Sequence, residues 1–109
     1  MSILGPFEVR FADQALEDLN RLFDFLLESA RAVEDLDVAQ QVIDEIKATC
    51  DGHLSKTPFS YRKSGASSLR RELIIPFRAT GYVAQYEIEP AVSRVIVIAV
   101  RHQREDDYH

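Results

Sequence analysis

Residues 69–100 read LRRELIIPFRATGYVAQYEIEPAVSRVIVIAV, and this stretch decides the fold. It holds three strand-like runs: residues 69–75, which Pro76 should end, residues 82–88 and residues 94–100. In the second run, Tyr82, Ala84, Tyr86 and Ile88 alternate with Val83, Gln85 and Glu87. The last run is a continuous β-branched block, which is typical of a central strand buried on both faces. The short turns between the runs predict that hairpins join them.

Two amphipathic helices are predicted upstream of these strands. Asp13 can cap the first, over about residues 14–31, and Asp35 or Asp37 can cap the second, which should end before Pro58. The link between them is short, so we expect an antiparallel helical hairpin. Apolar residues recur at helical spacing and form one stripe on each helix. The first stripe contains Leu16, Leu19, Phe23, Leu26, Leu27 and Ala30, and the second contains Ala39, Val42, Ile43, Ile46, Cys50 and Leu54.

A further strand is predicted near the N-terminus, where Phe7, Val9 and Phe11 alternate with charged residues. Residues 57–68 are rich in Ser, Thr, Gly and Pro and predict a loop. The predicted order is therefore β-α-α-β-β-β. This is an α+β domain, in which the helical hairpin packs on one face of a mostly antiparallel four-stranded sheet.

The composition indicates a single domain over residues 1–109, because 46% of the residues are hydrophobic and can supply a core. One cysteine excludes an intramolecular disulfide, and the few Cys and His residues do not have the spacing of a zinc site. No nucleotide-binding glycine motif occurs, so we expect neither a metal nor a cofactor. Cys50 and His53 lie on the second helix's stripe, which predicts a buried small hydrophobe and a packed, hydrogen-bonded core histidine.

Charge is unevenly distributed along the chain. Residues 1–55 hold 12 acidic and 4 basic residues, whereas residues 56–109 hold 6 acidic and 9 basic residues. The net charge of −5 argues against a protein that depends on the phosphate backbone, because such proteins need clustered Lys and Arg. The chain has no secretory signal and no apolar run of the ~20 residues that span a bilayer, so we expect a cytoplasmic protein.

Five short motifs occur in order along this framework. They are Ala15-Leu16-Glu17-Asp18-Leu19, Pro58 after the second helix, Leu69-Arg70-Arg71-Glu72-Leu73, Tyr82-Val83-Ala84-Gln85-Tyr86 and Val97-Ile98-Ala99-Val100-Arg101-His102-Gln103-Arg104-Glu105. With the order of elements, they resemble the ParE/RelE superfamily of toxins from type II toxin–antitoxin systems over nearly the whole chain. The ending His102-x-Arg104 is closer to ParE than to RelE.

The resemblance implies a toxin that is neutralised by a small cognate antitoxin, often a ParD-like protein with a ribbon-helix-helix DNA-binding domain. For ParE-like members it implies inhibition of DNA gyrase, with growth inhibition and plasmid stabilisation as consequences and no enzymatic activity. For RelE-like members it implies a ribosome-dependent mRNA endoribonuclease. A third interpretation is a member that has lost its toxicity and acts only as an antitoxin-binding co-repressor. We favour gyrase inhibition, because a pI of about 5.1 is low for a ribosome-binding protein.

If the protein is a nuclease, cleavage without a metal requires cations that stabilise the phosphorane and groups that move protons. The candidates are Arg71, His102, Arg104 and Tyr108. Arg71 and its neighbour Arg70 should point to opposite faces of their strand, so only one of them can reach the face without helices.

Each of these candidates also has a simpler explanation. Both strand arginines can serve only to keep a sheet surface soluble, and His102 can be a tail residue without a partner. Arg104 and Tyr108 lie among three carboxylates, which would repel a phosphate and offset the arginine. These carboxylates weigh against RNA cleavage by the C-terminal tail.

Contacts with a protein partner are predicted at Leu22, Phe25, Arg70, Arg71 and Arg101. Phe25 lies off the apolar stripe, and exposed aromatic side chains often anchor interfaces. Leu22 lies between Phe25 and the stripe. The alternative is that a sheet edge or the N-terminal arm covers both side chains. A partner helix could lie across such a patch, and an extended segment could add to a sheet edge.

Overall fold

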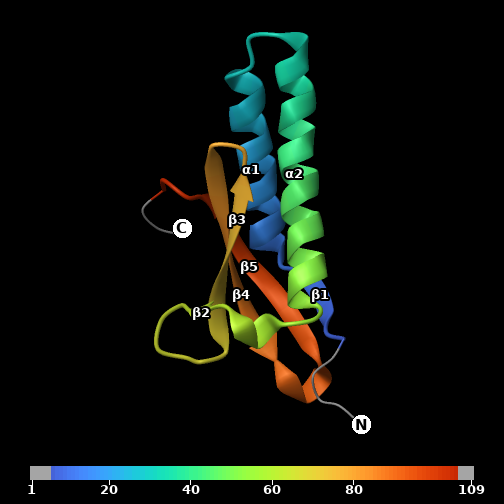
Figure 1. The fold of residues 1–109 in the computed structure, drawn as a ribbon, viewed down its shortest axis with the longest axis vertical. Coiled ribbons are helices and arrows are strands. Elements are labelled where there is room, and N and C mark those ends of the chain that lie inside the picture. The colour runs from blue at the N-terminus through green and yellow to red at the C-terminus, as the bar shows by residue number, and fades with distance from the viewer. Residues whose placement is uncertain (1–5, 106–109) are drawn as a thin grey trace.

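The computed structural model describes residues 6–105, which form two layers, a helical hairpin and a sheet (Figure 1). This is the predicted α+β architecture. The elements are β1 (Glu8–Phe11), α1 (Asp13–Glu28), α2 (Val33–Leu54), a 3-10 turn (Pro58–Ser60), β2 (Arg62–Lys63), β3 (Arg70–Phe77), β4 (Thr80–Glu89), a second 3-10 turn (Pro90–Val92) and β5 (Arg94–His102).

The sheet has the strand order β1-β5-β4-β3-β2, so it contains five strands and not the predicted four. The additional strand is β2, which lies in the segment that was predicted to be a loop and pairs Arg62 with Glu72 and Lys63 with Arg71. Only β1 and β5 are parallel; the other neighbours are antiparallel. β5 is an inner strand between β1 and β4, as predicted. It is not buried on both faces as the β-branched block suggested, because its residues alternate between buried and partly exposed positions and no helix of residues 6–105 covers the second face.

The prediction that Pro76 ends its strand is wrong, because β3 continues to Phe77. The carbonyl of Arg70 accepts a hydrogen bond from Ser64 N–H, so the backbone groups of Arg70 face β2. Alternation along the strand places the backbone groups of Pro76 on the same side. β2 ends before it reaches that position, so the N–H that proline lacks would point away from the sheet.

The helix starts differ from the predicted caps. Asp13 is the first residue of α1 and does not cap it, and α1 ends at Glu28 rather than near residue 31. α2 begins at Val33, before both predicted caps. Asp35 instead caps the helix from its first turn, because its carboxylate accepts hydrogen bonds from the N–H groups of Arg31 at 2.9 Å and Ala32 at 3.2 Å.

The hydrophobic core lies between the hairpin and the sheet. α1 packs through a slightly different face than predicted: Leu16 is 41% exposed, whereas Leu22 is only 4% exposed. Cys50 is buried as predicted, and burial raises the pKa of its thiol to about 12. The prediction of a core histidine is wrong, because His53 is exposed, although its Nδ1 lies 2.8 Å from the Tyr61 hydroxyl.

The molecule is elongated, with extents of 51 × 27 × 25 Å. Figure 1 shows why: the tip of the helical hairpin extends well beyond the end of the sheet. Across residues 6–105, no helix has the length and apolar character that crossing a membrane requires.

Candidate functional site

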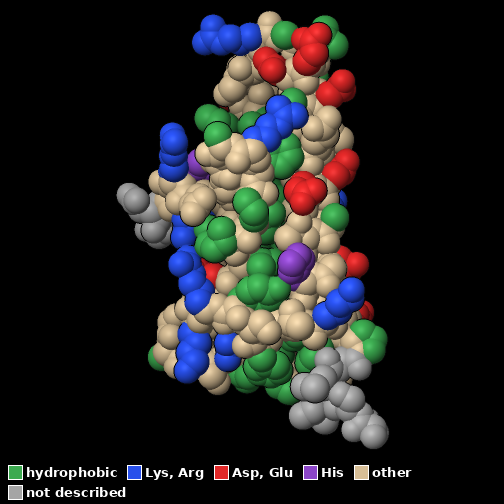
Figure 2. Space-filling view, in the orientation of Figure 1, with side chains coloured by type: hydrophobic (Ala, Val, Ile, Leu, Met, Phe, Trp, Pro, Cys, Tyr) green, Lys and Arg blue, Asp and Glu red, His purple; other side chains and the backbone are tan. Residues whose placement is uncertain are grey.

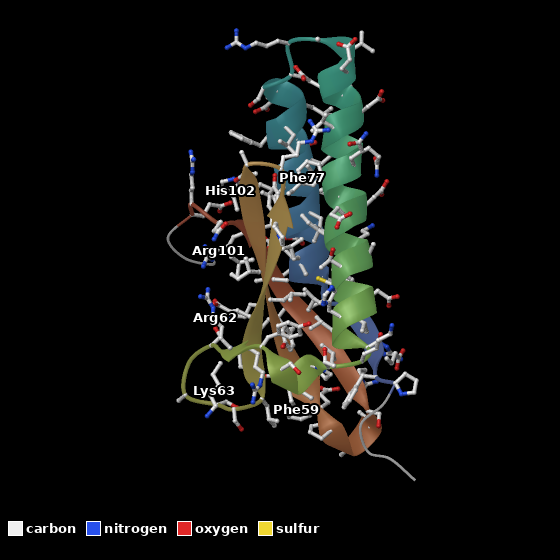
Figure 3. All side chains as sticks on the ribbon, in the orientation of Figure 1. Phe59, Arg62, Lys63, Phe77, Arg101 and His102 are labelled. Atoms are coloured by element: carbon white, nitrogen blue, oxygen red, sulfur yellow. The ribbon has the colours of Figure 1, made fainter. Side chains whose placement is uncertain are left out.

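A groove of about 950 Å³ opens between α1 and the end of the sheet where β4 begins and β5 ends. Its apolar lining comes from Leu22, Phe25 and Leu26 of α1 and Tyr82 of β4. Its polar lining contains Arg21, Asp24, Glu28, Thr80, His102, Arg104 and Glu105. Figure 3 shows His102 at this end of the sheet, beside the hairpin.

The two predicted apolar contact residues have different positions in this groove. Phe25 is 63% exposed, which confirms that it lies off the buried face of α1. Leu22 is 4% exposed and belongs to the core cluster, so it forms the inner wall of the groove and not an exposed patch. Leu22 is therefore covered, as the alternative interpretation allowed, whereas Phe25 is not.

Sequence reasoning missed Asp18, a buried carboxylate that attaches α1 to β5. β1 stops at Phe11, opposite Val97, so β5 has no strand neighbour on that side beyond this point. Asp18 is 1% exposed, and its carboxylate accepts a hydrogen bond from Val100 N–H at 2.8 Å. The carbonyl oxygen of Val100 accepts a hydrogen bond from the Arg21 guanidinium at 3.5 Å. The available signal was an acidic residue on the apolar face of a helix, within the Ala-x-x-Asp-Leu motif.

The turn that follows β5 is held by charged side chains. Arg21 of α1 forms an ion pair with Glu105 at 3.3 Å, and the Glu105 carboxylate also accepts a hydrogen bond from His102 N–H at 3.0 Å. Arg101, a predicted partner contact, donates from Nη1 to the carbonyl oxygens of His102, Gln103 and Glu105. Arg101 therefore has a structural role in shaping this turn.

His102 is held in one tautomer by two hydrogen bonds. Its Nδ1 accepts a hydrogen bond from Arg104 N–H at 3.1 Å, so the ring proton is on Nε2. Nε2 therefore donates to the hydroxyl of Thr80, which lies 2.6 Å away. A nitrogen that already carries a proton cannot act as a general base, so this arrangement does not activate a hydroxyl nucleophile.

Arg71 is used to fasten the loop between α2 and β3 at the other end of the sheet. Its guanidinium donates to the carbonyl oxygens of Ser68 at 2.8 Å, Phe59 at 3.0 Å and Tyr61 at 2.7 Å, and lies 5.5 Å from the centroid of the Phe59 ring. The buried hydroxyl of Tyr86 donates to the Pro58 carbonyl of the same loop at 2.6 Å. Arg71 thus contacts its own chain rather than a cleft on the helix-free face.

The structure does not bring the four nuclease candidates together. Arg71 pairs with Tyr86, and His102 pairs with Tyr82, four residues along β4, which corresponds to roughly 13 Å in a strand. Figure 3 shows this separation, with Phe59 and His102 towards opposite ends of the sheet. Arg104 is exposed in the turn after β5, and Tyr108 lies outside the described residues.

Four arginines on the sheet face without helices, Arg70 among them, lie in ion pairs with glutamates. A guanidinium that lies against a carboxylate has less charge available to a phosphate. The pairs are Arg10 with Glu8 at 2.6 Å, Arg62 with Glu72 at 2.8 Å, Arg70 with Glu87 at 3.0 Å and Arg94 with Glu89 at 2.8 Å.

On the helical side, acidic side chains gather along α2, as Figure 2 shows. In the part of the chain that the structure describes, no group of three or more His, Cys, Asp or Glu side chains could hold a metal ion.

The sequence matches the family described as the ParE toxin of the type II toxin–antitoxin system parDE, over residues 9–107. The chain belongs to the ParE toxin family. Its fold is similar to those of three solved toxin structures, all below 25% identity, so they support the fold alone. No curated protein sequence matches the chain.

The first of these structures is from the chromosomal ParDE system of P. aeruginosa, with a TM-score of 0.67 and 11% identity over 93% of this chain and 98% of that chain. The second is from the RelBE2 toxin–antitoxin complex of Mycobacterium tuberculosis, with a TM-score of 0.63 and 18% identity over 94% and 97%. The third is the isolated E. coli RelE toxin, with a TM-score of 0.59 and 16% identity over 92% and 88%.

Proposed function

We propose that this ParE-family toxin acts in the cytoplasm by binding and inhibiting DNA gyrase, and that it does so without catalysing a reaction. The observation that carries this proposal is the pairing of the arginines. Four on the helix-free face lie against glutamates, and Arg71 and Arg101 donate to carbonyl groups of their own loops. A protein whose arginines are already bound within its own chain is better suited to binding another protein than to stabilising a pentavalent phosphate.

A ribosome-dependent endoribonuclease of RelE type is the second candidate. The observation in its favour is that His102 and Arg104 lie side by side in the groove. Against it stands the tautomer of His102, which leaves Nε2 protonated, and the distance from that ring to Arg71. A phosphoryl-transfer site needs its cations and its proton-transfer groups around one phosphate.

We propose that the neutralising partner is a small ParD-like antitoxin with a ribbon-helix-helix DNA-binding domain. The family description names a two-component system, parDE, and two of the similar folds come from toxin–antitoxin pairs. The exposed Phe25 and the largely apolar groove beside it offer such a partner a binding surface.

The test is a supercoiling assay with purified toxin, gyrase and relaxed plasmid. We expect the toxin to block supercoiling, cells that express it to accumulate gyrase-cleaved DNA, and preincubation with antitoxin to restore the reaction. Translated messages, followed by primer extension in the same cells, should stay intact. As a control for the second candidate, replacing His102 with Gln and Arg104 with Ala together should remove mRNA cleavage if any occurs.

Three outcomes separate the interpretations. Unaffected supercoiling with cleaved messages would replace gyrase inhibition with the nuclease. Normal growth when the toxin is expressed without antitoxin would identify a co-repressor that has lost toxicity, and it should then bind the operator together with the antitoxin. Blocked supercoiling with intact messages is the result that we expect.

A further inference from the structure

The groove between α1 and the turn after β5 has walls of opposite charge. Asp24 and Glu28 lie one helical turn apart on the α1 wall, and both are exposed. Arg104 is exposed on the opposite wall. Within residues 6–105 none of these three side chains forms an ion pair. The remaining two charged lining residues, Arg21 on the α1 wall and Glu105 on the turn wall, pair with each other at 3.3 Å, so the division of charge depends on Asp24, Glu28 and Arg104.

Between these walls the groove is apolar. Leu22, Leu26 and Tyr82 line its floor, and Phe25 stands at its edge with 63% of its surface exposed. A large aromatic side chain beside a largely apolar groove is the kind of residue that anchors a protein interface. The groove is bounded by one helix on one side and by the end of the sheet with its turn on the other, so it fits a single segment of a partner better than a broad surface.

We propose that this division of charge selects the cognate antitoxin, which makes Asp24, Glu28 and Arg104 specificity-determining residues. The matching antitoxin segment is an amphipathic helix whose apolar stripe covers Phe25 and the floor. It carries two Lys or Arg residues one turn apart facing Asp24 and Glu28, and an Asp or Glu facing Arg104. The inference rests on the proposed function only in taking the partner to be an antitoxin.

The spacing of the acidic wall sets the spacing of the cations on the partner. Residues four apart in a helix are separated by about 6 Å along its axis. A partner helix that lies alongside α1 has the same rise, so cations four residues apart on it can meet both carboxylates. A wrong antitoxin with acidic residues at these positions would place like charges together, which excludes it.

The first test reverses the acidic wall. The affinity of the full-length toxin for its full-length antitoxin is measured by calorimetry for wild type and for the double variant Asp24→Lys, Glu28→Lys. We expect affinity to fall at least tenfold, and the fall of affinity with added salt to become weaker. The matched control is Asp44→Lys, Asp51→Lys, which changes net charge equally on exposed positions of α2 outside the groove, and should change affinity less than about threefold.

A second variant tests the anchor, and a compensating change tests the pairing. Phe25→Ala should weaken antitoxin binding on the order of 30-fold, while its urea unfolding curve stays close to that of wild type because the side chain is exposed. In the antitoxin, replacing the two facing Lys or Arg residues by Glu should restore binding to the charge-reversed toxin and weaken binding to the wild type.

Several results would overturn the inference. Equal losses in the groove variant and the α2 control would indicate general electrostatic attraction, and unchanged affinity in the groove variants would place the antitoxin elsewhere. Loss of gyrase binding with unchanged antitoxin affinity would assign the groove to the target. A wild-type toxin that leaves supercoiling intact would remove gyrase inhibition but not these results, because antitoxin affinity is measured without gyrase.

Discussion

The two ends of the sheet share one feature and differ in another: an arginine fastens the loop at each end, Arg71 at one and Arg101 at the other, but the groove end also has an apolar groove lined by charged side chains. At the end near the 3-10 turn Pro58–Ser60, Arg71 and Tyr86 direct their polar atoms to carbonyl groups of their own loop. At the end near the groove, Phe25 is exposed and Asp24, Glu28 and Arg104 form no ion pairs among the described residues. The type of a residue therefore does not reveal whether it is structural or free to bind a partner. That depends on whether its polar atoms are already hydrogen-bonded to backbone groups of its own chain.

The largest effect is expected where the loop is fastened. Arg71→Ala removes hydrogen bonds to three backbone carbonyls and the contact with the Phe59 ring, so we expect the free energy of unfolding to fall by about 2–4 kcal/mol. Arg71→Lys should recover only a minor part, because an ammonium group lacks the planar fork that reaches several carbonyls. Urea unfolding of the three proteins measures both changes.

The same variant tests the comparison between the two ends. Antitoxin affinity of folded Arg71→Ala should stay close to that of wild type, since the change lies at the other end of the sheet from the groove. If Arg71→Ala kept its stability but abolished toxicity, Arg71 would be a functional residue and the assignment of this end to structure would be wrong.

Much of the fold could be predicted because periodicity reports burial directly. Alternation and helical spacing predicted the four longer strands, both helices and their order. β2 could not be predicted in this way, since two residues have no periodicity and Arg62 and Lys63 form a strand only through pairing with β3. The strand end predicted at Pro76 was wrong for a related reason. The sequence shows that proline lacks an N–H, but it does not show that β2 ends before this position and that no strand of residues 6–105 would accept a hydrogen bond from that N–H.

The candidate site was less accessible to sequence reasoning. The exposure of Phe25 followed from its position off the apolar stripe. The roles of Arg71 and Asp18 did not, because each depends on backbone groups that are distant in sequence, the carbonyls of the loop and the N–H of Val100. That N–H lacks a strand partner only because β1 ends early, and this is a property of the assembled sheet.

A second prediction concerns stability at alkaline pH, where the thiol of Cys50 and the hydroxyl groups of Tyr86 and Tyr82 should lose their protons. Burial raises the pKa of Cys50 from 9.0 to about 12, and burial also raises the pKa of Tyr86 and of Tyr82. The unfolded chain loses these protons at lower pH than the folded chain does. Stability is therefore intact below about pH 9 and decreases as the pH rises further, by up to about 1.4 kcal/mol per pH unit for each group.

The measurement is urea unfolding at pH 8 and pH 10.5. We expect the free energy of unfolding of the wild type to be lower by about 2 kcal/mol at the higher pH from the thiol alone. Cys50→Ala should show a shallower dependence on pH, since only the tyrosines remain. Parallel pH curves for the two proteins would mean that the thiol does not titrate differently in the folded and unfolded states.

The smallest effects are expected at two turn residues, one at each end of the sheet. Ser93 and Arg78 both have positive φ, 50° and 55°, which is unfavourable for a residue with a Cβ. Ser93→Gly should raise the free energy of unfolding by about 0.5–1 kcal/mol, because relief of this strain exceeds the added entropy of the unfolded chain.

Arg78→Gly should give less, because the arginine also contributes contacts. Its guanidinium lies 5.4 Å from the centroid of the Phe77 ring and 3.5 Å from the side-chain oxygen of Gln41 on α2. Loss of these contacts should offset most of the relief, which thermal unfolding of both variants can detect. An equal gain in both would show that the contacts of Arg78 add no stability. Arg78 would then have no part in attaching the β3–β4 turn to α2, and the charged contacts that fasten the groove end would be those that Arg101 and Arg21 make in the turn after β5.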